Sequence, residues 1–289
     1  MRLLTTVFLS FCTSLCYSQG GWLKSKGELY AQLTEQGFAA TDYYNLNGVD
    51  LQTSQFNYLS TQLYAEYGLF KHLTTIISWP LVTRQQFETT EAVTGVGDLK
   101  IELKFPIYQK ELNIAFSVAP EIPIGNRNLF AQSKLLSFEQ INLPSGDGEF
   151  NVWSTLAASS SIGSLPAYLT LHSSYNYRTH YLNTPFQDQW ANGLKLGYNP
   201  FKALWLEAQL STLSRVGEQK GATEFTRGNG TTYTSLILGV SYEIIRNCGL
   251  SLKYQRSNNL IVPQRNIYQA NLFSLGIYYQ RKPKEQPKN

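Results

Sequence analysis

The stretch His172-Ser-Ser174 places a histidine two residues before a serine. In a β-strand these two side chains share one face, because successive side chains alternate between the two sides of a strand. A serine beside a base is a combination used in nucleophilic catalysis, provided that a third group orients the base. A polar lining of a barrel wall, shared with Asn176 and Arg178 on the same face, is the simpler interpretation and the one we expect.

Few other residues suggest chemistry. The remaining histidines, His72 and His180, fall in expected turns and lack the spacing of metal ligands. Cys248 is the one cysteine that follows the first 16 residues, so neither an internal disulfide nor a cysteine metal cluster is expected. We therefore assign no catalytic residue, no bound metal and no cofactor.

A glycine-rich stretch, Gly95-Val-Gly-Asp98, matches part of a phosphate-binding loop. It lacks the Gly-Lys-Ser/Thr ending of such a loop, and no helical pattern follows it. We expect a turn at the outer rim of a sheet instead. In this turn Gly95 and Gly97 would give the backbone freedom, and Asp98 would cap the turn.

Apolar and polar residues alternate along much of the chain. From Gly97 to Phe105 the apolar side chains occupy the odd positions and the charged side chains the even ones. A helix would scatter these charges around its axis, whereas a strand separates them onto two faces. Most such segments are near the roughly 9–11 residues that a tilted strand needs to cross a bilayer. The segments, about twelve in all, begin near Gly27, Gln55, Leu73, Gly97, Leu112, Gly148, Ala167, Gln189, Leu204, Tyr233, Leu250 and Tyr268.

The composition excludes several other classes of protein. The chain of 289 residues is 43% hydrophobic, 13% aromatic and only 15% charged, and its mean hydropathy is −0.24. A helical membrane protein would need repeated apolar spans of about 20 residues, and a disordered chain would lack the aromatic residues. The 24 Lys and Arg against 20 Asp and Glu leave no basic excess for nucleic-acid binding.

The connections between the segments alternate in length. Short turns such as 68–72 and 163–166 alternate with longer loops such as 125–147 and 216–232. Outer-membrane barrels have this pattern because short turns face the periplasm and long loops face outward. We therefore predict an all-β protein, a closed antiparallel up-and-down transmembrane β-barrel of about 12 strands over residues 19–280. The alternative is a secreted β-sandwich, in which a further layer would have to cover the apolar faces.

Both ends of the chain agree with export. Residues 1–18 have the features of a secretory signal peptide, with Arg2 near the start, an apolar stretch and small residues before Gln19. Residues 281–289 form a polar tail, which we place in the periplasm because an even number of strands returns the chain to its starting side. The expected location is the bacterial cell outer membrane, in contact with its lipid and without a nucleic-acid partner. The sequence leaves the oligomeric state open, and a monomer is the expectation.

Charged residues on the strands would face the inside of such a barrel. As a polar conduit they would select solutes by charge; alternatively they would pair with one another across a filled barrel. The predicted lumen-lining charges are Glu66, Lys100, Glu102, Lys104, Glu121, Arg178, Lys195, Glu207 and Lys253.

Several motifs resemble a family of bacterial outer-membrane proteins named for the meta-pathway of phenol degradation. They are Glu66-Tyr-Gly-Leu-Phe-Lys-His-Leu-Thr74 with Trp79-Pro-Leu81, Gly95-Val-Gly-Asp-Leu-Lys100, Ala119-Pro-Glu-Ile-Pro-Ile-Gly125, and Leu143-Pro-Ser-Gly-Asp-Gly148. The resemblance covers mostly the first half of the chain after residue 18. It implies a transporter barrel for small, often hydrophobic molecules, and it implies no catalytic residues.

Three functions follow from these patterns. The first is a channel that passes small, hydrophobic or aromatic molecules through a polar-lined barrel. The second is a lipid hydrolase, because His172-x-Ser174 resembles the pair of outer-membrane phospholipase A, also a twelve-stranded barrel; that motif continues into Asn-Gly, whereas Tyr175-Asn176 follows here. The third is a structural or adhesive barrel whose long loops bind an outside partner.

Overall fold

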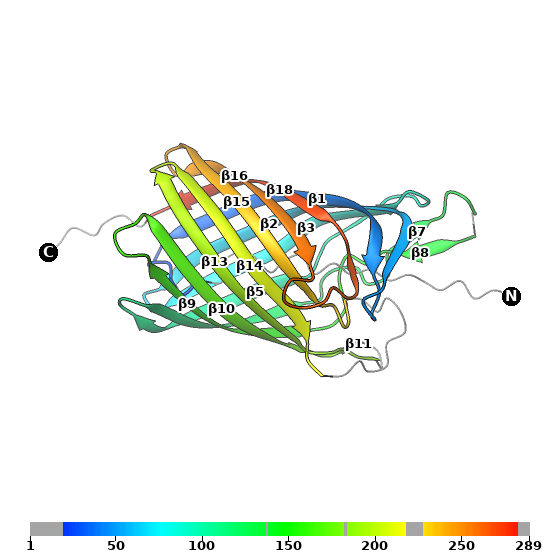
Figure 1. Ribbon diagram of the computed structural model, residues 1–289, viewed down its shortest axis with the longest axis horizontal. Helices are drawn as coiled ribbons and strands as arrows, with labels where there is room; N and C mark the ends of the chain where they lie inside the picture. The colour runs from blue at the N-terminus through cyan, green and yellow to red at the C-terminus, as the bar shows by residue number, and fades with distance from the viewer. Residues whose placement is uncertain (1–19, 137, 182–183, 218–227, 283–289) are drawn as a thin grey trace.

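The computed structural model describes residues 20–136, 138–181, 184–217 and 228–282. In these residues twelve long antiparallel strands close into a barrel (Figure 1), as the alternation predicted. The twelve strands are β1 (Leu29–Tyr44), β2 (Asp50–Phe70), β3 (Leu73–Phe87), β5 (Leu99–Gln109), β6 (Asn113–Ile122), β9 (Asn151–Ser161), β10 (Ala167–Arg178), β13 (Gln189–Phe201), β14 (Leu204–Arg215), β15 (Tyr233–Ile245), β16 (Cys248–Asn258) and β18 (Asn271–Arg281).

The first strand closes the barrel by pairing on both of its edges. Leu29 of β1 lies opposite Tyr67 of β2 on one side and opposite Arg281 of β18 on the other. Each remaining strand pairs with its neighbours in sequence among the twelve. Closure leaves no strand edge unpaired, which is the condition for a sheet to exist in lipid.

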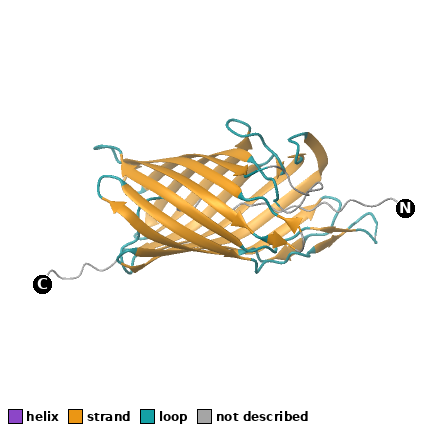
Figure 2. Cartoon of the chain, turned by 90° about the horizontal axis from the view of Figure 1, so that it is seen from below, coloured by secondary structure: helices purple, strands orange, loops and turns teal. Residues whose placement is uncertain are grey.

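The two ends of the barrel differ (Figure 2). Short turns join β2 to β3, β5 to β6, β9 to β10, β13 to β14 and β15 to β16, and we call this the short-turn end. The opposite, long-loop end carries the longer connections. Their short strands are β4 (Val93–Gly95), β7 (Phe130–Gln132), β8 (Gln140–Asn142), β11 (His180–Tyr181), β12 (Thr184–Pro185) and β17 (Ile267–Tyr268).

The two faces of each strand have different surroundings. Along β18, Phe273, Leu275 and Ile277 are more than half exposed on the outside. Ser274 and Tyr278, at even-numbered positions of the same strand, are buried on the inside. This is the arrangement of a barrel in a bilayer, apolar where lipid would lie and more polar within. None of the described residues forms a helix long and apolar enough to span a membrane.

The lumen is less polar than the sequence led us to expect. In its long-loop half, aromatic rings such as Phe56 and Tyr268 stack at 4.7 Å, and Trp153, Leu213 and Tyr233 form a second buried cluster. The strands here exceed the length that crosses a bilayer, since β2 alone has 21 residues. Beyond the bilayer the inward side chains meet the loops, so they pack as the core of a water-soluble protein does.

Two predictions concern residues outside the described part of the chain. The signal peptide, residues 1–18, lies wholly there, as does most of the polar tail, 283–289. Of the expected tail, Arg281 is the last residue of β18.

Candidate functional site

The segment that precedes β1 lies inside the short-turn half of the barrel. The backbone N–H of Gly21 donates to Ser159 Oγ at 2.8 Å, and that of Lys24 donates to Thr74 Oγ1 at 2.9 Å. Ser159 and Thr74 are buried and face the lumen from β9 and β3. Residues 20–28 fall within the range that we expected to form the barrel wall, but 20–25 run through its interior. We call residues 20–26 the N-terminal plug.

Close packing holds the plug against the wall. A Cβ atom at Gly21 would lie 1.7 Å from the carbonyl oxygen of Asn113, so only glycine fits there. The Trp22 ring meets the Tyr168 ring edge-on, with centroids 5.4 Å apart. The Tyr168 ring lies in turn against Gly197, where a Cβ would come within 2.1 Å of it. Gly21 and Gly197 therefore allow the plug backbone and the Tyr168 ring to lie close against the wall.

Two cavities adjoin the plug. The larger has a volume of about 600 Å³ and the smaller about 360 Å³. Both are lined by Lys24, Tyr168, Lys195 and Trp205. The larger adds Trp22 and His172, and the smaller adds Tyr30, Tyr64 and Tyr278. A small organic molecule in either cavity would meet aromatic faces and paired charges together.

Three of the predicted lumen charges form one network. Lys195 Nζ lies 2.7 Å from Glu207 Oε1, and Lys253 Nζ lies 3.8 Å from Glu207 Oε2. The Tyr168 hydroxyl also donates to Glu207, at 3.0 Å. Lys253 reaches Glu207 across β15 at Gly239, where a Cβ would lie 3.5 Å from both side chains, at ordinary contact distance.

The plug pairs with another of the predicted charges. Lys24 Nζ lies 3.4 Å from Glu28 and 4.0 Å from Glu66, both at the short-turn end. Glu66 also accepts a hydrogen bond from the Tyr64 hydroxyl at 2.6 Å. The plug is thus held by a charge as well as by packing.

The other predicted charges are dispersed over the wall. Lys100 Nζ lies 5.7 Å from the centre of the Trp153 ring, whose indole N–H donates to Glu121 at 3.0 Å. Lys104 is only 2% exposed. Glu102 has one buried carboxylate oxygen without a hydrogen-bond partner among the described residues. The structure therefore brings charges together in local groups and not in one ring.

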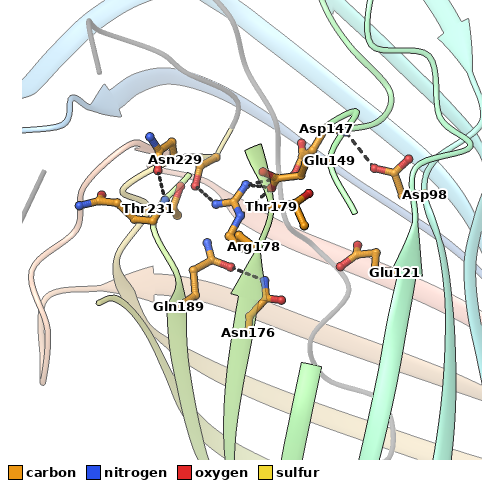
Figure 3. Close-up of polar contacts among 12 residues, drawn as sticks. Asp98, Glu121, Asp147, Glu149, Asn176, Arg178, Thr179, Gln189, Asn229 and Thr231 are labelled. Atoms are coloured by element: carbon orange, nitrogen blue, oxygen red, sulfur yellow. Dashed lines mark hydrogen bonds and ion pairs between the residues drawn. The ribbon is translucent and has the colours of Figure 1, made fainter. Parts of the chain in front are cut away.

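Arg178 is the centre of a buried network at the long-loop end (Figure 3). Its guanidinium makes two hydrogen bonds to Glu149 Oε1, one of them from Nε at 2.6 Å, and donates to the Gly228 carbonyl at 3.1 Å. It also lies 3.7 Å from Asp147 and 4.6 Å from the centre of the Phe186 ring. These partners belong to three separate long loops, so Arg178 joins the loops to the end of β10. We call this group the Arg178 clasp.

The predicted rim turn joins the same region. Asp98 Oδ1 accepts the backbone N–H of Gly125 at 2.9 Å, and Oδ2 accepts that of Asp147 at 2.8 Å. Gly95 and Gly97 have ordinary backbone angles, and the absence of a side chain there leaves room for neighbouring groups. A Cβ would lie 2.5 Å from Ser145 Oγ at Gly95, and 2.7 Å from the Pro80 ring at Gly97. Asp98 thus ties together the two ends of the long loop between β6 and β9.

Two loop carboxyls, the half-buried Asp98 and the buried Glu149, have raised pKa values. Burial, with a smaller contribution from nearby Asp147, raises the pKa of Asp98 from its usual 3.8 to about 7. Burial also raises the pKa of Glu149 to about 8, although Arg178 limits the rise. A carboxyl whose pKa is higher in the packed state binds more protons there. Its contribution to packing therefore falls as pH rises from the usual pKa to the raised one.

We expect hydrogen exchange of residues 143–150, corrected for its intrinsic rate, to be slower at pH 5 than at pH 8. In Asp98→Asn this pH dependence should become smaller between pH 4 and 7, because one of the two titrating carboxyls is gone. An unchanged pH dependence in Asp98→Asn would exclude Asp98 as a source. The strands of the barrel wall serve as the internal reference.

The His172 and Ser174 side chains share the inner face of β10, but they do not form a catalytic pair. Ser174 Oγ lies 2.8 Å from Thr155 Oγ1. The His172 ring rests against Gly193, where a Cβ would lie 2.1 Å from it. Within the described part of the chain no hydrogen bond joins His172 to Ser174. The arrangement gives no support to a hydrolase.

Sequence patterns did not reveal the plug or the acidic partners of Arg178. Trp22 and Lys24 precede the first alternating segment, and their wall partners are far away in the sequence, such as Thr74 for Lys24. Glu149 fell at the start of the alternating segment that we expected near Gly148. Nothing in the sequence there indicates that Arg178 is its partner. The adjacent glycines at 20 and 21 were the one available signal of close backbone approach.

No family model matches the sequence, and no curated protein matches it. Among solved structures, the COG4313 outer membrane channel from Pseudomonas putida F1 is similar, with a TM-score of 0.66 and 14% sequence identity. The match covers 89% of this chain and 96% of that one. The translocator domain of autotransporter NalP from Neisseria meningitidis has a TM-score of 0.51 at 10% identity, covering 89% of each chain. These likenesses establish the fold, and the resemblance to the meta-pathway family stays a prediction.

Proposed function

We propose that this chain is a bacterial outer-membrane channel for small molecules, and that hydrophobic or aromatic molecules are its preferred solutes. The observation that carries the proposal is the lumen of the closed barrel. It holds cavities of about 600 and 360 Å³ beside the N-terminal plug, a segment that is not part of the wall. The solved barrel from Pseudomonas putida F1, described as an outer membrane channel, has the same fold.

Aromatic side chains support the preference for apolar solutes. Trp22, Tyr168 and Trp205 border the larger cavity. Farther toward the long-loop end, Phe56 and Tyr268 line the inside of the barrel. Aromatic faces bind flat apolar molecules well. A solute in the larger cavity would meet such faces directly, whereas Phe56 and Tyr268, each 1% exposed, stack on each other.

An uptake assay in cells tests the proposal. A Gram-negative host deficient in its own porins would produce the chain, and uptake of labelled naphthalene and of a labelled disaccharide would be measured. We expect naphthalene uptake to rise above that of the empty host and disaccharide uptake to change little. If only disaccharide uptake rises, the chain is a channel but the proposed preference for aromatic solutes is wrong. If neither uptake rises, the proposal of a channel is wrong.

Charge balance inside the barrel yields a further prediction. Glu207 is the shared anion of Lys195 and Lys253, so Glu207→Gln removes the negative charge that both lysines contact. In a KCl gradient across a planar bilayer, we expect the reversal potential of Glu207→Gln to move toward anion selectivity. Lys253→Gln is the matched control and should move it in the opposite direction. Both are measured in the variant that lacks residues 20–26, so that ions have an open path. Equal reversal potentials in the two variants would contradict a conducting lumen at this level.

A further inference from the structure

Two charged side chains face outward from the wall, where lipid would lie. Glu35 on β1 and Arg256 on β16 are both exposed on the outer side of their strands. The Thr61 hydroxyl donates to Glu35, and within the described part of the chain neither residue forms an ion pair. An ionised group facing hydrocarbon is unfavourable and usually marks a function. A third outward charge, Arg84, lies on β3 toward the long-loop end.

The wall between these two charges is strongly apolar. The strands β16, β18 and β1 lie side by side (Figure 1), with β18 in the middle. Its outward side chains Phe273, Leu275 and Ile277 are 58%, 56% and 64% exposed. The surface therefore has an apolar centre with an acid on one side and a base on the other.

The two charges lie at nearly the same depth in the wall. Cys248, where β16 begins, lies opposite Tyr279, and Tyr279 lies opposite Ala31, two residues beyond the start of β1. By the same register Glu35 aligns with Leu252, so its depth corresponds to about Tyr254 on β16. Arg256 is then about 5 Å nearer the long-loop end, for a strand that rises about 3.4 Å per residue at a tilt of about 40°. The long arginine side chain spans this offset.

Glu35 lies well inside the apolar band. It is six residues from Leu29, the start of β1 at the short-turn end. At the same rise and tilt this places Glu35 about 16 Å into a band about 25 Å tall. Neighbouring outward side chains include Leu33, at 47% exposure, and Leu275.

We infer that this face binds a second copy of the same chain in the membrane. A twofold axis along the membrane normal, in front of β18, places β1 of each copy opposite β16 of the other. Glu35 of each copy then lies opposite Arg256 of its partner, and the two β18 surfaces meet between these pairs. Each charge gains a counter-ion in a medium of low dielectric, where such pairs are strong. A monomer, which the sequence led us to expect, leaves both charges facing lipid.

Disulfide cross-linking tests this dimer without reference to solute passage. With Cys248 replaced by Ser, Leu275→Cys places one thiol near the axis, and oxidation of native outer membranes should yield a species of twice the monomer mass. Leu156→Cys is the matched control, because Leu156 is similarly exposed, at 51%, on β9 at the opposite side of the barrel. It should yield no such species.

Charge reversal then tests the pairing. Adding Glu35→Arg to Leu275→Cys should remove most of the cross-linked product, and Glu35→Arg with Arg256→Glu should restore it. A heat-dependent shift in gel mobility verifies that each barrel is folded. The inference is overturned if Leu275→Cys cross-links no better than Leu156→Cys, if Glu35→Arg has no effect, or if the product has the mass of another partner.

Discussion

Removing residues 20–26 should increase the single-channel conductance of the barrel, because the two cavities beside the plug then join into one wider path through the short-turn half. The plug narrows the short-turn half, where the hydrogen bonds of Gly21 and Lys24 to the wall and the contact of Trp22 with Tyr168 hold it. Gly27, whose positive φ of 79° turns the chain into β1, is retained in this variant. The measurement is conductance in planar bilayers.

Two controls separate opening from damage to the barrel. The heat-dependent gel shift of the shortened chain should equal that of the full chain, because residues 20–26 contribute no strand to the wall. Trp22→Ala keeps the plug but removes its ring from Tyr168, so its conductance should lie between the two. If the shortened and full chains conduct equally, the plug is not the barrier.

Breaking the Arg178 clasp should have the second large effect. At pH 9, above the raised pKa of about 8, Arg178→Gln leaves the ionised Glu149, only 1% exposed, without its cationic partner. Removing one member of a buried ion pair costs about 3–5 kcal/mol, and here the cost falls on the packing of three loops. We expect limited proteolysis to cleave the long loops at least about tenfold faster, since about 1.4 kcal/mol corresponds to a factor of ten.

A double-mutant cycle assigns the effect to the pair. Arg178→Gln with Glu149→Gln replaces two charges by two neutral amides of similar size, so it should cost less than the sum of the single changes. Additive costs would show that Arg178 and Glu149 act independently. The barrel wall should stay intact in all three variants, as judged by the gel shift.

The wall of the barrel could be predicted from the sequence because the alternation of apolar and polar residues along each strand indicates which face is outside. Leu275 and Ser274 differ in polarity, and their neighbours repeat that difference every two residues. No partner strand needs to be known for this inference. The number of strands and the short and long connections follow from the same local pattern.

The inside of the barrel required information that no single segment holds. Arg178 was predicted to point inward, but its partner Glu149 lies in a loop. In a loop no alternation of apolar and polar residues indicates which way a side chain points. Likewise, the buried Phe38 and Tyr58 stack on adjacent strands at a level beyond the bilayer, where an inward side chain no longer needs to be polar. The inward side chains are thus mostly polar in the short-turn half, whereas aromatic clusters occupy much of the other half.

On the proposed function, solutes pass through the lumen only when the N-terminal plug moves aside. A disulfide tests it most directly. A Cβ at Gly20 would lie 3.3 Å from Ser159 Oγ, close to what a disulfide between these positions requires. With Cys248 replaced by Ser, the variant Gly20→Cys with Ser159→Cys should take up naphthalene no faster than the empty host when oxidised, and as fast as the wild type when reduced. Uptake that is equally fast in the oxidised and reduced states would contradict the account.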